Sequence, residues 1–455
     1  MLQSLRFLTV LVGIPVLAGA AEPSVRLITL DPGHFHAGLI QKEMYDGVSP
    51  TVNVYAPLGP DLFGHLGRIA AFNQRSEKPT RWRLEVHTGP DFFERMLREK
   101  PGNVVVISGR NRGKIDRILA SVEAGLNVLA DKPWLIDEAD LPKLRKALDT
   151  AEAKGLVAYD VMTERYEITT ILQGELARDP DIAGRLRPGT PAEPTFYIDS
   201  VHNLMKTVSG APLIRPSWFF DTEEQGEALA DVGTHLVDLA AFVLFPGQAI
   251  AETDTRILAA KRWPTTLSRE QLLRVIGGPA VPPSLGAKMS GDRLDYYCNT
   301  QVDYTLRGLH VRLDARWDYE APPGGGDTHF AVVRGSRARI EVRQGAAEKW
   351  RTELYVVPVA PADRPALLAA VRRKVASLAG RYPGLAVADA GDAVQVLVPD
   401  SFRTGHEAHF AEVTTRFLEY LRAPGSVPAW EKANMLAKYA VTTRGTQLSR
   451  KAARP

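Results

Sequence analysis

The sequence predicts an α/β fold in which a doubly wound parallel sheet is followed by an α+β domain with an open antiparallel sheet. The chain has 455 residues, a length that fits two domains better than one. Residues 24 to about 160 alternate short apolar runs with helical patterns, which is typical of a parallel sheet. Beyond residue 162 many strands alternate polar and apolar residues, as in antiparallel sheets. We therefore expect a Rossmann-like domain over 21–160 and an α+β domain over 161–455.

The first domain is predicted from hydrophobic periodicity. Strands are expected at 25–30, 51–55, 84–87, 103–107, 127–130 and 156–159. Helices are expected at 35–44, 91–99, 115–122 and 141–151. The stretch from 56 to about 78 is marked by proline and glycine, so we expect an irregular insertion there.

The second domain is predicted less completely. Its expected strands lie at 195–200, 299–306, 310–317, 330–333 and 338–342. Helices are expected at 364–378 and 407–421, and a proline- and glycine-rich loop at 322–326.

Composition limits the classes of function. Apolar residues make up 45% of the chain and charged residues 24%, which is typical of a globular protein with real cores. The 56 basic and 53 acidic residues give a net charge of +3, so charge gives no reason to expect nucleic acid or an anionic membrane as partner. The lone cysteine, Cys298, excludes an intramolecular disulfide or a zinc finger and is expected to be a buried thiol.

The N-terminus predicts a Sec-type signal peptide over residues 1–20. Arg6 gives a positive start, 7–17 is almost entirely apolar, and Ala18-Gly-Ala20 is typical of a cleavage site. The apolar run is shorter than the roughly 20 residues that a membrane-spanning helix needs, and no other segment is long and apolar enough. We expect export to the periplasm or the extracellular space.

Two motifs carry the chemistry. Asp131-Lys132-Pro133 follows an expected strand, and Asp231-x-Gly-x-His235-x-x-Asp238 lies about one hundred residues later. A lysine just past a strand end and a later Asp/His pair can move a proton off a hydroxyl while hydride leaves the same carbon. His235 is the expected general acid or base, because its unperturbed pKa lies near working pH. Asp231 is expected on the same helical face, where it binds hydroxyls or orients His235.

The turn after the first strand departs from the dinucleotide fingerprint G-x-G-x-x-G. It reads Asp31-Pro-Gly33-His34-Phe-His36, so only the middle glycine is present. Asp31 would place a negative charge near a pyrophosphate, and His36 fills the space of the third glycine. In the alternative interpretation, Asp31 caps the following helix and the two histidines are simply packed.

With these motifs the sequence resembles the Gfo/Idh/MocA family of sugar and polyol oxidoreductases over about residues 24–320. Arg215-Pro-Ser-Trp218 resembles the family's R-P-x-W segment. The resemblance implies NAD or NADP as cofactor, tightly bound and recycled in an exported member. It implies a sugar or glycoside as substrate and a homo-oligomer as the assembly.

The resemblance also implies roles for particular residues. Catalysis is assigned to Lys132, His235 and Asp231. Cofactor binding is assigned to Asp31, Gly33, His34, His36, Ser108, Arg110, Asn111, Asp131 and Pro133. Substrate binding is assigned to Glu164, Arg165, Tyr166 and Trp218, and no metal is expected. A surface role for Arg110, and a plain helical turn at 164–166, remain alternatives.

His406-Glu-Ala-His409 departs from the zinc motif H-E-x-x-H, so packing is favoured over metal binding there. The expected reaction is NAD(P)-dependent hydride transfer at a secondary alcohol of a sugar, sugar derivative or glycoside. One alternative is glycoside cleavage through transient oxidation with a recycled NAD. Another is a non-redox carbohydrate-binding protein, or a metal-dependent hydrolase or lyase that uses the histidines.

Overall fold

The computed structural model describes residues 24–208 and 211–452. The predicted signal peptide at 1–20 lies outside these residues. Within the described ranges, no helix combines the length and the apolar character needed to cross a membrane.

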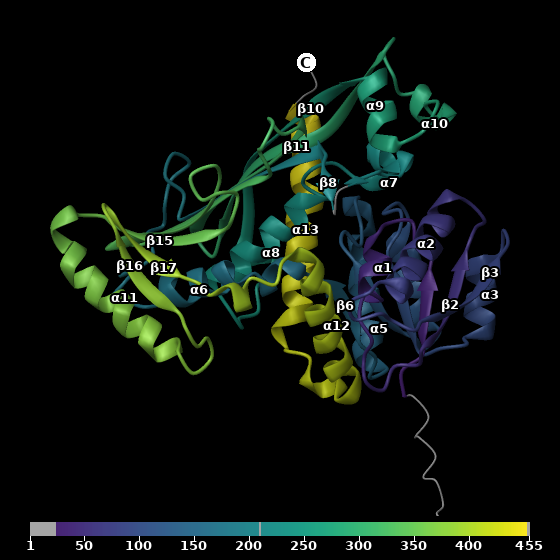
Figure 1. Ribbon diagram of the computed structural model, residues 1–455, viewed down its shortest axis with the longest axis horizontal. Helices are drawn as coiled ribbons and strands as arrows, with labels where there is room; N and C mark the ends of the chain where they lie inside the picture. The colour runs from purple at the N-terminus through teal and green to yellow at the C-terminus, as the bar shows by residue number, and fades with distance from the viewer. Residues whose placement is uncertain (1–23, 209–210, 453–455) are drawn as a thin grey trace, which may run out of the picture.

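The first domain contains a six-stranded parallel sheet, as predicted (Figure 1). The strand order is β3-β2-β1-β4-β5-β6, which is the order of a doubly wound dinucleotide-binding fold. The strands are β1 (Leu27–Leu30), β2 (Thr51–Ala56), β3 (Arg83–Thr88), β4 (Val104–Ile107), β5 (Asn127–Asp131) and β6 (Ala158–Val161). The order reverses between β1 and β4, so a crevice is expected outside their carboxyl ends.

Five helices accompany this sheet: α1 (His36–Ile40), α2 (Pro60–Gln74), α3 (Phe92–Glu99), α4 (Lys114–Glu123) and α5 (Leu141–Ala153). The irregular insertion expected at 56–78 is wrong, because α2 occupies most of it. Pro60 stands in the first turn, where proline is tolerated. Leu62, His65 and Ile69 recur at helical spacing and are buried.

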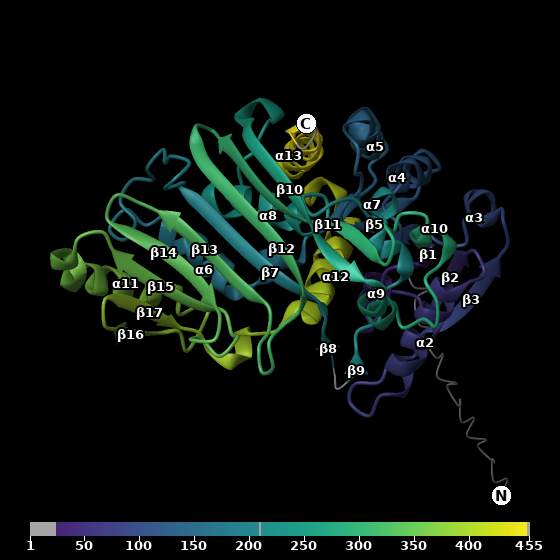
Figure 2. The same cartoon turned by 90° about the horizontal axis from the view of Figure 1, so that it is seen from above.

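The second domain contains a nine-stranded sheet of order β10-β11-β12-β7-β13-β14-β15-β17-β16 (Figure 2). All its neighbouring pairs are antiparallel except β12 and β7, which are parallel. The strands are β7 (Phe196–Met205), β10 (Thr255–Ser268), β11 (Arg293–Leu306), β12 (Leu309–Glu320), β13 (Thr328–Arg334), β14 (Ala338–Gln344), β15 (Glu353–Pro358), β16 (Ala386–Ala390) and β17 (Ala393–Leu397). A small separate pair is formed by β8 (Thr207–Val208) and β9 (Ala211–Pro212).

The remaining helices are α6 (Ile168–Ala177), α7 (Thr222–Gln225), α8 (Val232–Leu244), α9 (Arg269–Ile276), α10 (Pro283–Gly286), α11 (Arg364–Leu378), α12 (His406–Arg422) and α13 (Trp430–Ala452). Helices α6 and α8 pack in the core of the second domain. Cys298 is buried in the same core, as expected. The last two helices return to the first domain: Phe410 and Phe417 of α12 and Tyr439 of α13 belong to its apolar clusters. Helix α13, yellow in Figure 1, therefore lies between the two sheets.

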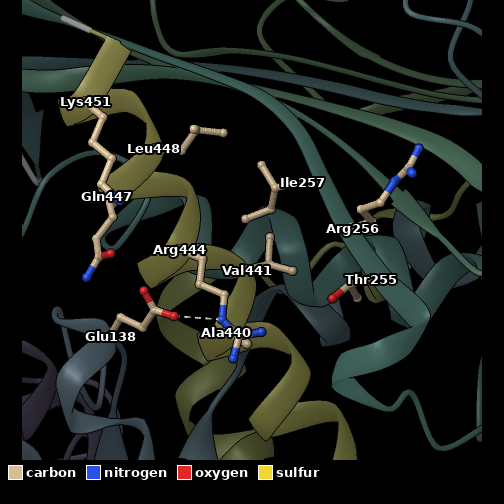
Figure 3. A pocket seen from close by; sticks show the side chains of 10 residues that line it. All are labelled: Glu138, Thr255, Arg256, Ile257, Ala440, Val441, Arg444, Gln447, Leu448 and Lys451. Atoms are coloured by element: carbon tan, nitrogen blue, oxygen red, sulfur yellow. Dashed lines mark hydrogen bonds and ion pairs between the residues drawn. The ribbon is translucent and has the colours of Figure 1, made fainter. Parts of the chain in front are cut away.

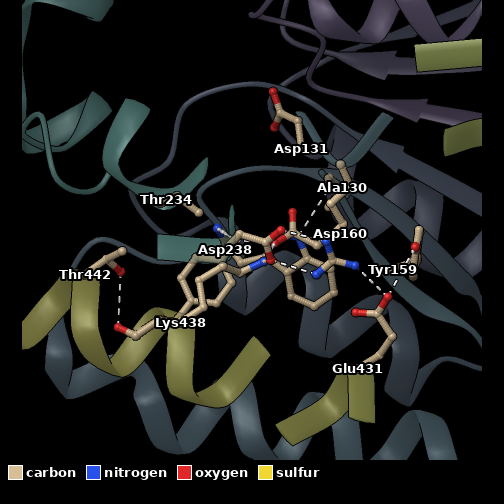
Figure 4. Close-up of polar contacts among 12 residues, drawn as sticks. Ala130, Asp131, Tyr159, Asp160, Thr234, Asp238, Glu431, Lys438 and Thr442 are labelled. Atoms are coloured by element: carbon tan, nitrogen blue, oxygen red, sulfur yellow. Dashed lines mark hydrogen bonds and ion pairs between the residues drawn. The ribbon is translucent and has the colours of Figure 1, made fainter. Parts of the chain in front are cut away.

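A network of buried ion pairs connects β6, α8 and α13 (Figure 4). Lys438 of α13 donates to Asp160 of β6 at 2.9 Å and to Asp238 of α8 at 3.2 Å. Arg165 donates to both carboxylate oxygens of Asp238, at 2.6 and 2.7 Å, and to Glu431 at 2.7 Å. Burial would raise the pKa of Asp238, but the Arg165 and Lys438 cations hold it well below its usual range. The network therefore holds fully charged groups in the interior.

We expect Lys438→Met to lower the free energy of unfolding by about 3–5 kcal/mol, because two buried carboxylates lose their shared cation. The matched control is Lys432→Met on the same helix, whose partners Asp149 and Glu152 are exposed. That control should cost less than about 1 kcal/mol. Guanidinium unfolding followed by circular dichroism measures the free energy of unfolding of both variants. Equal losses in the two variants would contradict the conclusion that the buried network stabilises the contact between these elements.

Candidate active site

A cavity of about 790 Å³ lies between the first sheet's crevice and the second sheet. Its walls combine polar and apolar side chains, and six of the chain's ten histidines line it: His34, His36, His202, His235, His329 and His406. Such a concentration of imidazoles in one cavity favours proton-transfer or ligand-binding chemistry there.

The two motifs predicted to carry the chemistry meet in this cavity. Lys132 directly follows β5, and Asp231 occupies the N-cap position of α8. The Lys132 ammonium donates to the Asp231 carboxylate at 2.7 Å and to its backbone carbonyl at 3.2 Å. Burial would raise the pKa of Asp231, but Lys132 outweighs it and holds that pKa below its usual range. The cavity therefore carries an ion pair whose two members come from different domains.

His235 lies in the first turn of α8 and lines the same cavity. Burial, followed by the Lys132 charge, lowers the pKa of His235 to about 3. The folded structure thus moves the pKa of His235 far below its unperturbed value near working pH, and the imidazole is neutral at pH 7. Asp231 does not orient His235, because it precedes the helix and its carboxylate is engaged with Lys132. The His235 Nδ1 atom is buried without a partner in the described structure.

Of the three adjacent residues assigned to substrate binding, Glu164 alone lines the cavity. Its carboxylate pairs with His406 at 3.1 Å, and this hydrogen bond overrides burial to hold the pKa of Glu164 well below its usual range. Arg165 is committed to Asp238 and Glu431, so its predicted substrate role is wrong. Tyr166 packs against the first domain's apolar cluster instead of lining the cavity.

The loop that replaces the glycine fingerprint is held by its own backbone. The Gly33 amide donates to the Asp31 carbonyl at 2.8 Å, and the His34 amide donates to the Ser108 carbonyl at 3.0 Å. Asp31 adopts a positive φ of 47° and pairs its carboxylate with Arg117 of α4. It does not cap α1, so the capping alternative is wrong. The two amides that a pyrophosphate would seek are already engaged.

Asp131 faces away from the cavity into a buried cluster. Its carboxylate accepts from Lys114 at 2.6 Å and from Ser108 at 2.8 Å, and lies 3.1 Å from His36 and 3.6 Å from His34. Among the described residues, His34, His36 and Asp131 form the one group whose ligand atoms are close enough to share a cation. Lys114 already neutralises that carboxylate. The His406/His409 pair does not form such a group in the described chain.

The space above Gly33 is covered by side chains from elsewhere. Trp218 of η3 (Ser217–Phe220) donates to Asp61 of α2 at 3.0 Å, and Arg110 lies 3.4 Å from the same carboxylate. A methyl group added at Gly33 would come within 3.1 Å of Asp61 and 3.3 Å of Trp218. Asn111 donates to Gln225 at 2.7 Å. In the structure, therefore, Arg110 and Asn111 contact other protein groups, and Trp218 contacts Asp61 and does not line the cavity.

The wall formed by the second sheet was not predicted from the sequence. Ser200 and His202 of β7, Trp317 of β12 and Asp327 before β13 all line the cavity. Ser200 and His202 stand two positions apart, so they project from the same face of the strand. That alternation could have indicated from the sequence that Ser200 and His202 share a face. The strand expected from the sequence ended at residue 200, however, so His202 lay outside it.

A second hollow of about 390 Å³ lies between α13 and β10 (Figure 3). Arg444 there donates to Glu138 at 3.0 Å. None of the motif residues reaches it. The histidine-lined cavity is therefore the candidate active site.

Comparison with known proteins shows the family of the chain. Residues 172–450 match the family described as "Putative oxidoreductase C terminal domain". The chain belongs to this family. It is an oxidoreductase. A putative oxidoreductase from Parabacteroides merdae ATCC 43184 is 43% identical, with a TM-score of 0.92 over 95% of this chain and 99% of that one. No curated protein matches the sequence.

More distant solved structures share the fold. GenD2 from gentamicin A biosynthesis, in complex with NAD, is 16% identical with a TM-score of 0.56 over 97% of this chain and 98% of that one. KijD10, a 3-ketoreductase from Actinomadura kijaniata in complex with NADP and TDP-benzene, is 14% identical with a TM-score of 0.55 over 92% and 97%. The expected fold class is confirmed.

The depressed pKa of His235 predicts acid sensitivity. Between pH 6.5 and about 3 the unfolded histidine binds a proton that the folded one does not, so stability falls as pH falls through this window. Between pH 7 and pH 4, the free energy of unfolding should fall in both proteins. We expect the fall to be smaller in His235→Gln than in wild type, by up to about 3 kcal/mol. Urea unfolding at both pH values measures this, with His87→Gln, outside the cavity, as control. Identical pH dependence in His235→Gln and wild type would refute the prediction.

Proposed function

We propose that this oxidoreductase is a Gfo/Idh/MocA-type enzyme that transfers hydride between NAD or NADP and a secondary alcohol of a sugar, sugar derivative or glycoside. The observation that carries the proposal is the meeting of Lys132, Asp231 and His235 at one cavity beside the parallel sheet. The NAD and NADP complexes of GenD2 and KijD10, and the name 3-ketoreductase given to KijD10, support it.

The cavity suits a polyhydroxylated ligand. Its volume lies within the range of about 300–1,000 Å³ that is usual for small-molecule sites. Trp350 supplies an apolar surface for the ring face of a sugar, while imidazoles and carboxylates supply partners for hydroxyls. Export, predicted from the N-terminal segment, would expose the enzyme to sugars outside the cytoplasm.

The chain's own groups divide the proton chemistry between them. The Lys132 ammonium, fixed by Asp231, donates a hydrogen bond to the oxygen of the reacting carbinol and favours its loss of a proton. We assign the acceptance of that proton to His235, which lines the same cavity and is unprotonated at pH 7, although burial makes it a weak base. Asp231 keeps Lys132 in place and accepts from a neighbouring hydroxyl. Glu164 and His406, the latter on α12, pair with each other and line the same cavity.

NAD(P), when bound, supplies the hydride acceptor or donor. The residues fit the nicotinamide half of the dinucleotide, since Lys132, His34 and His36 line the cavity at the crevice. The pyrophosphate and the adenosine half would be expected near Gly33, which Asp61 and Trp218 cover. These two side chains would have to move apart to admit that half of the cofactor. Arg110 is the cation available there once Asp61 releases it.

We expect Asp61→Ala to speed NAD association by at least about threefold, because it removes both the cover over Gly33 and a negative charge near the phosphates. Stopped-flow fluorescence with NAD measures the rate. Asp91→Ala, an exposed carboxylate paired with Arg98 on α3, is the control. An unchanged association rate in Asp61→Ala would show that the contact does not limit entry.

We expect Lys132→Met to reduce turnover of oxidisable methyl glycosides by about a hundredfold to ten-thousandfold with NAD or NADP supplied. The double variant Lys132→Met/Asp231→Asn avoids leaving a buried carboxylate unpaired and should be equally inactive, with an unchanged circular dichroism spectrum. Lys143→Met, on the exposed face of α5, is the control. Full activity in a folded Lys132→Met variant would overturn the proposal.

The cover over Gly33 also favours a second candidate, glycoside cleavage through transient oxidation with a recycled cofactor. A dinucleotide enclosed by Asp61 and Trp218 would leave slowly, so it would be reused in each turnover. Mass spectrometry of the denatured protein tests this: stoichiometric NAD(H) together with cleavage in the absence of added cofactor supports it. Oxidised sugar released only when NAD is added supports net oxidation.

A further inference from the structure

The sheet wall of the cavity carries three side chains that the redox proposal does not use. The Ser200 hydroxyl lies 2.9 Å from Nε2 of His202, and Nδ1 of His202 lies 3.3 Å from the carboxylate of Asp327. All three residues line the cavity. This is the connectivity of a nucleophile, its base and the group that orients the base.

Asp327 is itself firmly held. Its Oδ1 accepts from the backbone amide of Asn203 at 3.1 Å and from the Asn203 side chain at 3.0 Å, and Lys206 pairs with its Oδ2. Burial would raise the pKa of Asp327, but the hydrogen bond from His202 and the Lys206 charge hold it well below its usual range. The ionised carboxylate can only accept, so it selects the tautomer that carries its proton on Nδ1 of His202. That tautomer presents the Nε2 lone pair to Ser200.

The surroundings fix the imidazole and place a cation in the same cavity. The His202 ring packs on Trp317 with centroids 4.8 Å apart. Arg215 stacks on Trp317 at 4.9 Å and lines the same cavity, which places a cation near this wall. The trio therefore has a base held in place by its neighbours and a positive group in the same cavity.

We propose that Ser200, His202 and Asp327 form a catalytic triad that gives the cavity a second, non-redox activity, the hydrolysis of an O-acyl ester on a polyhydroxylated substrate. Ser200 Oγ bonds to the acyl carbon while its proton passes to Nε2 of His202. The ester C–O bond breaks, and His202 returns the proton to the leaving alcohol. Water then adds to the acyl carbon, its proton passes through His202 back to Ser200, and the carboxylic acid leaves. Arg215, which also donates to the backbone carbonyls of Leu204 and Asn203, is the cation that we assign to the oxyanion of each tetrahedral step.

This activity needs neither a dinucleotide nor Lys132, so it stands independently of the proposed redox function. Hydrogen bonding of sugar hydroxyls by the same three residues would not activate the serine. A covalent probe therefore separates the two roles.

The test treats the purified full-length protein with diisopropyl fluorophosphate and maps the adduct by peptide mass spectrometry. We expect phosphylation of Ser200, in which the Oγ–P bond forms, fluoride leaves and the proton passes to His202. Hydrolysis of p-nitrophenyl acetate and of an O-acetylated methyl glycoside should accompany it. His202→Gln and Asp327→Asn should slow labelling by about a hundredfold to ten-thousandfold.

Thr170→Val is the matched control, because Thr170 is another buried hydroxyl that lines the cavity. Its labelling at Ser200 should equal that of wild type. Lys132→Met should also label, even where redox turnover is lost. Absence of an adduct on Ser200 in the folded wild-type protein would overturn the proposal, as would equal labelling rates in wild type and a folded His202→Gln variant.

Discussion

The buried contact between Arg165, Lys438 and the carboxylates of Asp160 and Asp238 is the constraint on which the candidate site depends. Asp160 belongs to β6, the neighbour of the strand that ends just before Lys132, while Asp238 lies on the helix that begins after Asp231. Because unpaired charges in the interior are costly, β6, α8 and α13 are held in one arrangement. That arrangement brings the Lys132 ammonium to the Asp231 carboxylate.

The same low-polarity interior sets the protonation states of the cavity. Burial lowers the pKa values of His34, His36, His235 and His329, so these imidazoles are neutral at pH 7. The carboxylates that remain ionised do so because each has a cationic or hydrogen-bonding partner. The result is a cavity with many proton acceptors and few free charges. Such a surface suits recognition of hydroxyl groups, and it serves both the proposed redox step and the proposed ester hydrolysis.

The turn after β1 shows how the fold tolerates the loss of its glycine fingerprint. Helix α4 supplies Lys114 and Arg117, one turn apart, and they neutralise Asp131 and Asp31 respectively. Position 109 still requires glycine, because a methyl group there would come within 2.3 Å of the Asp31 carbonyl oxygen. In this loop, the backbone amides that would face a ligand donate to protein carbonyls, and the carboxylate of Asp31 is paired with Arg117. Any dinucleotide must be held chiefly by side chains at this point.

The sequence by itself determined the alternating strands and helices of the first domain, the start of the second sheet, and the two motifs that carry Lys132 and His235. These signals are local, since apolar periodicity and turn residues act over a few positions. Helix α2 was missed because its proline and glycines resemble a loop until the buried spacing of Leu62 and Ile69 is seen. Only the tertiary structure decided the partners of Arg165, the neutral state of His235 and the meeting of His202 with Asp327. Those depend on burial and on contacts between residues far apart in the chain, which no local pattern encodes.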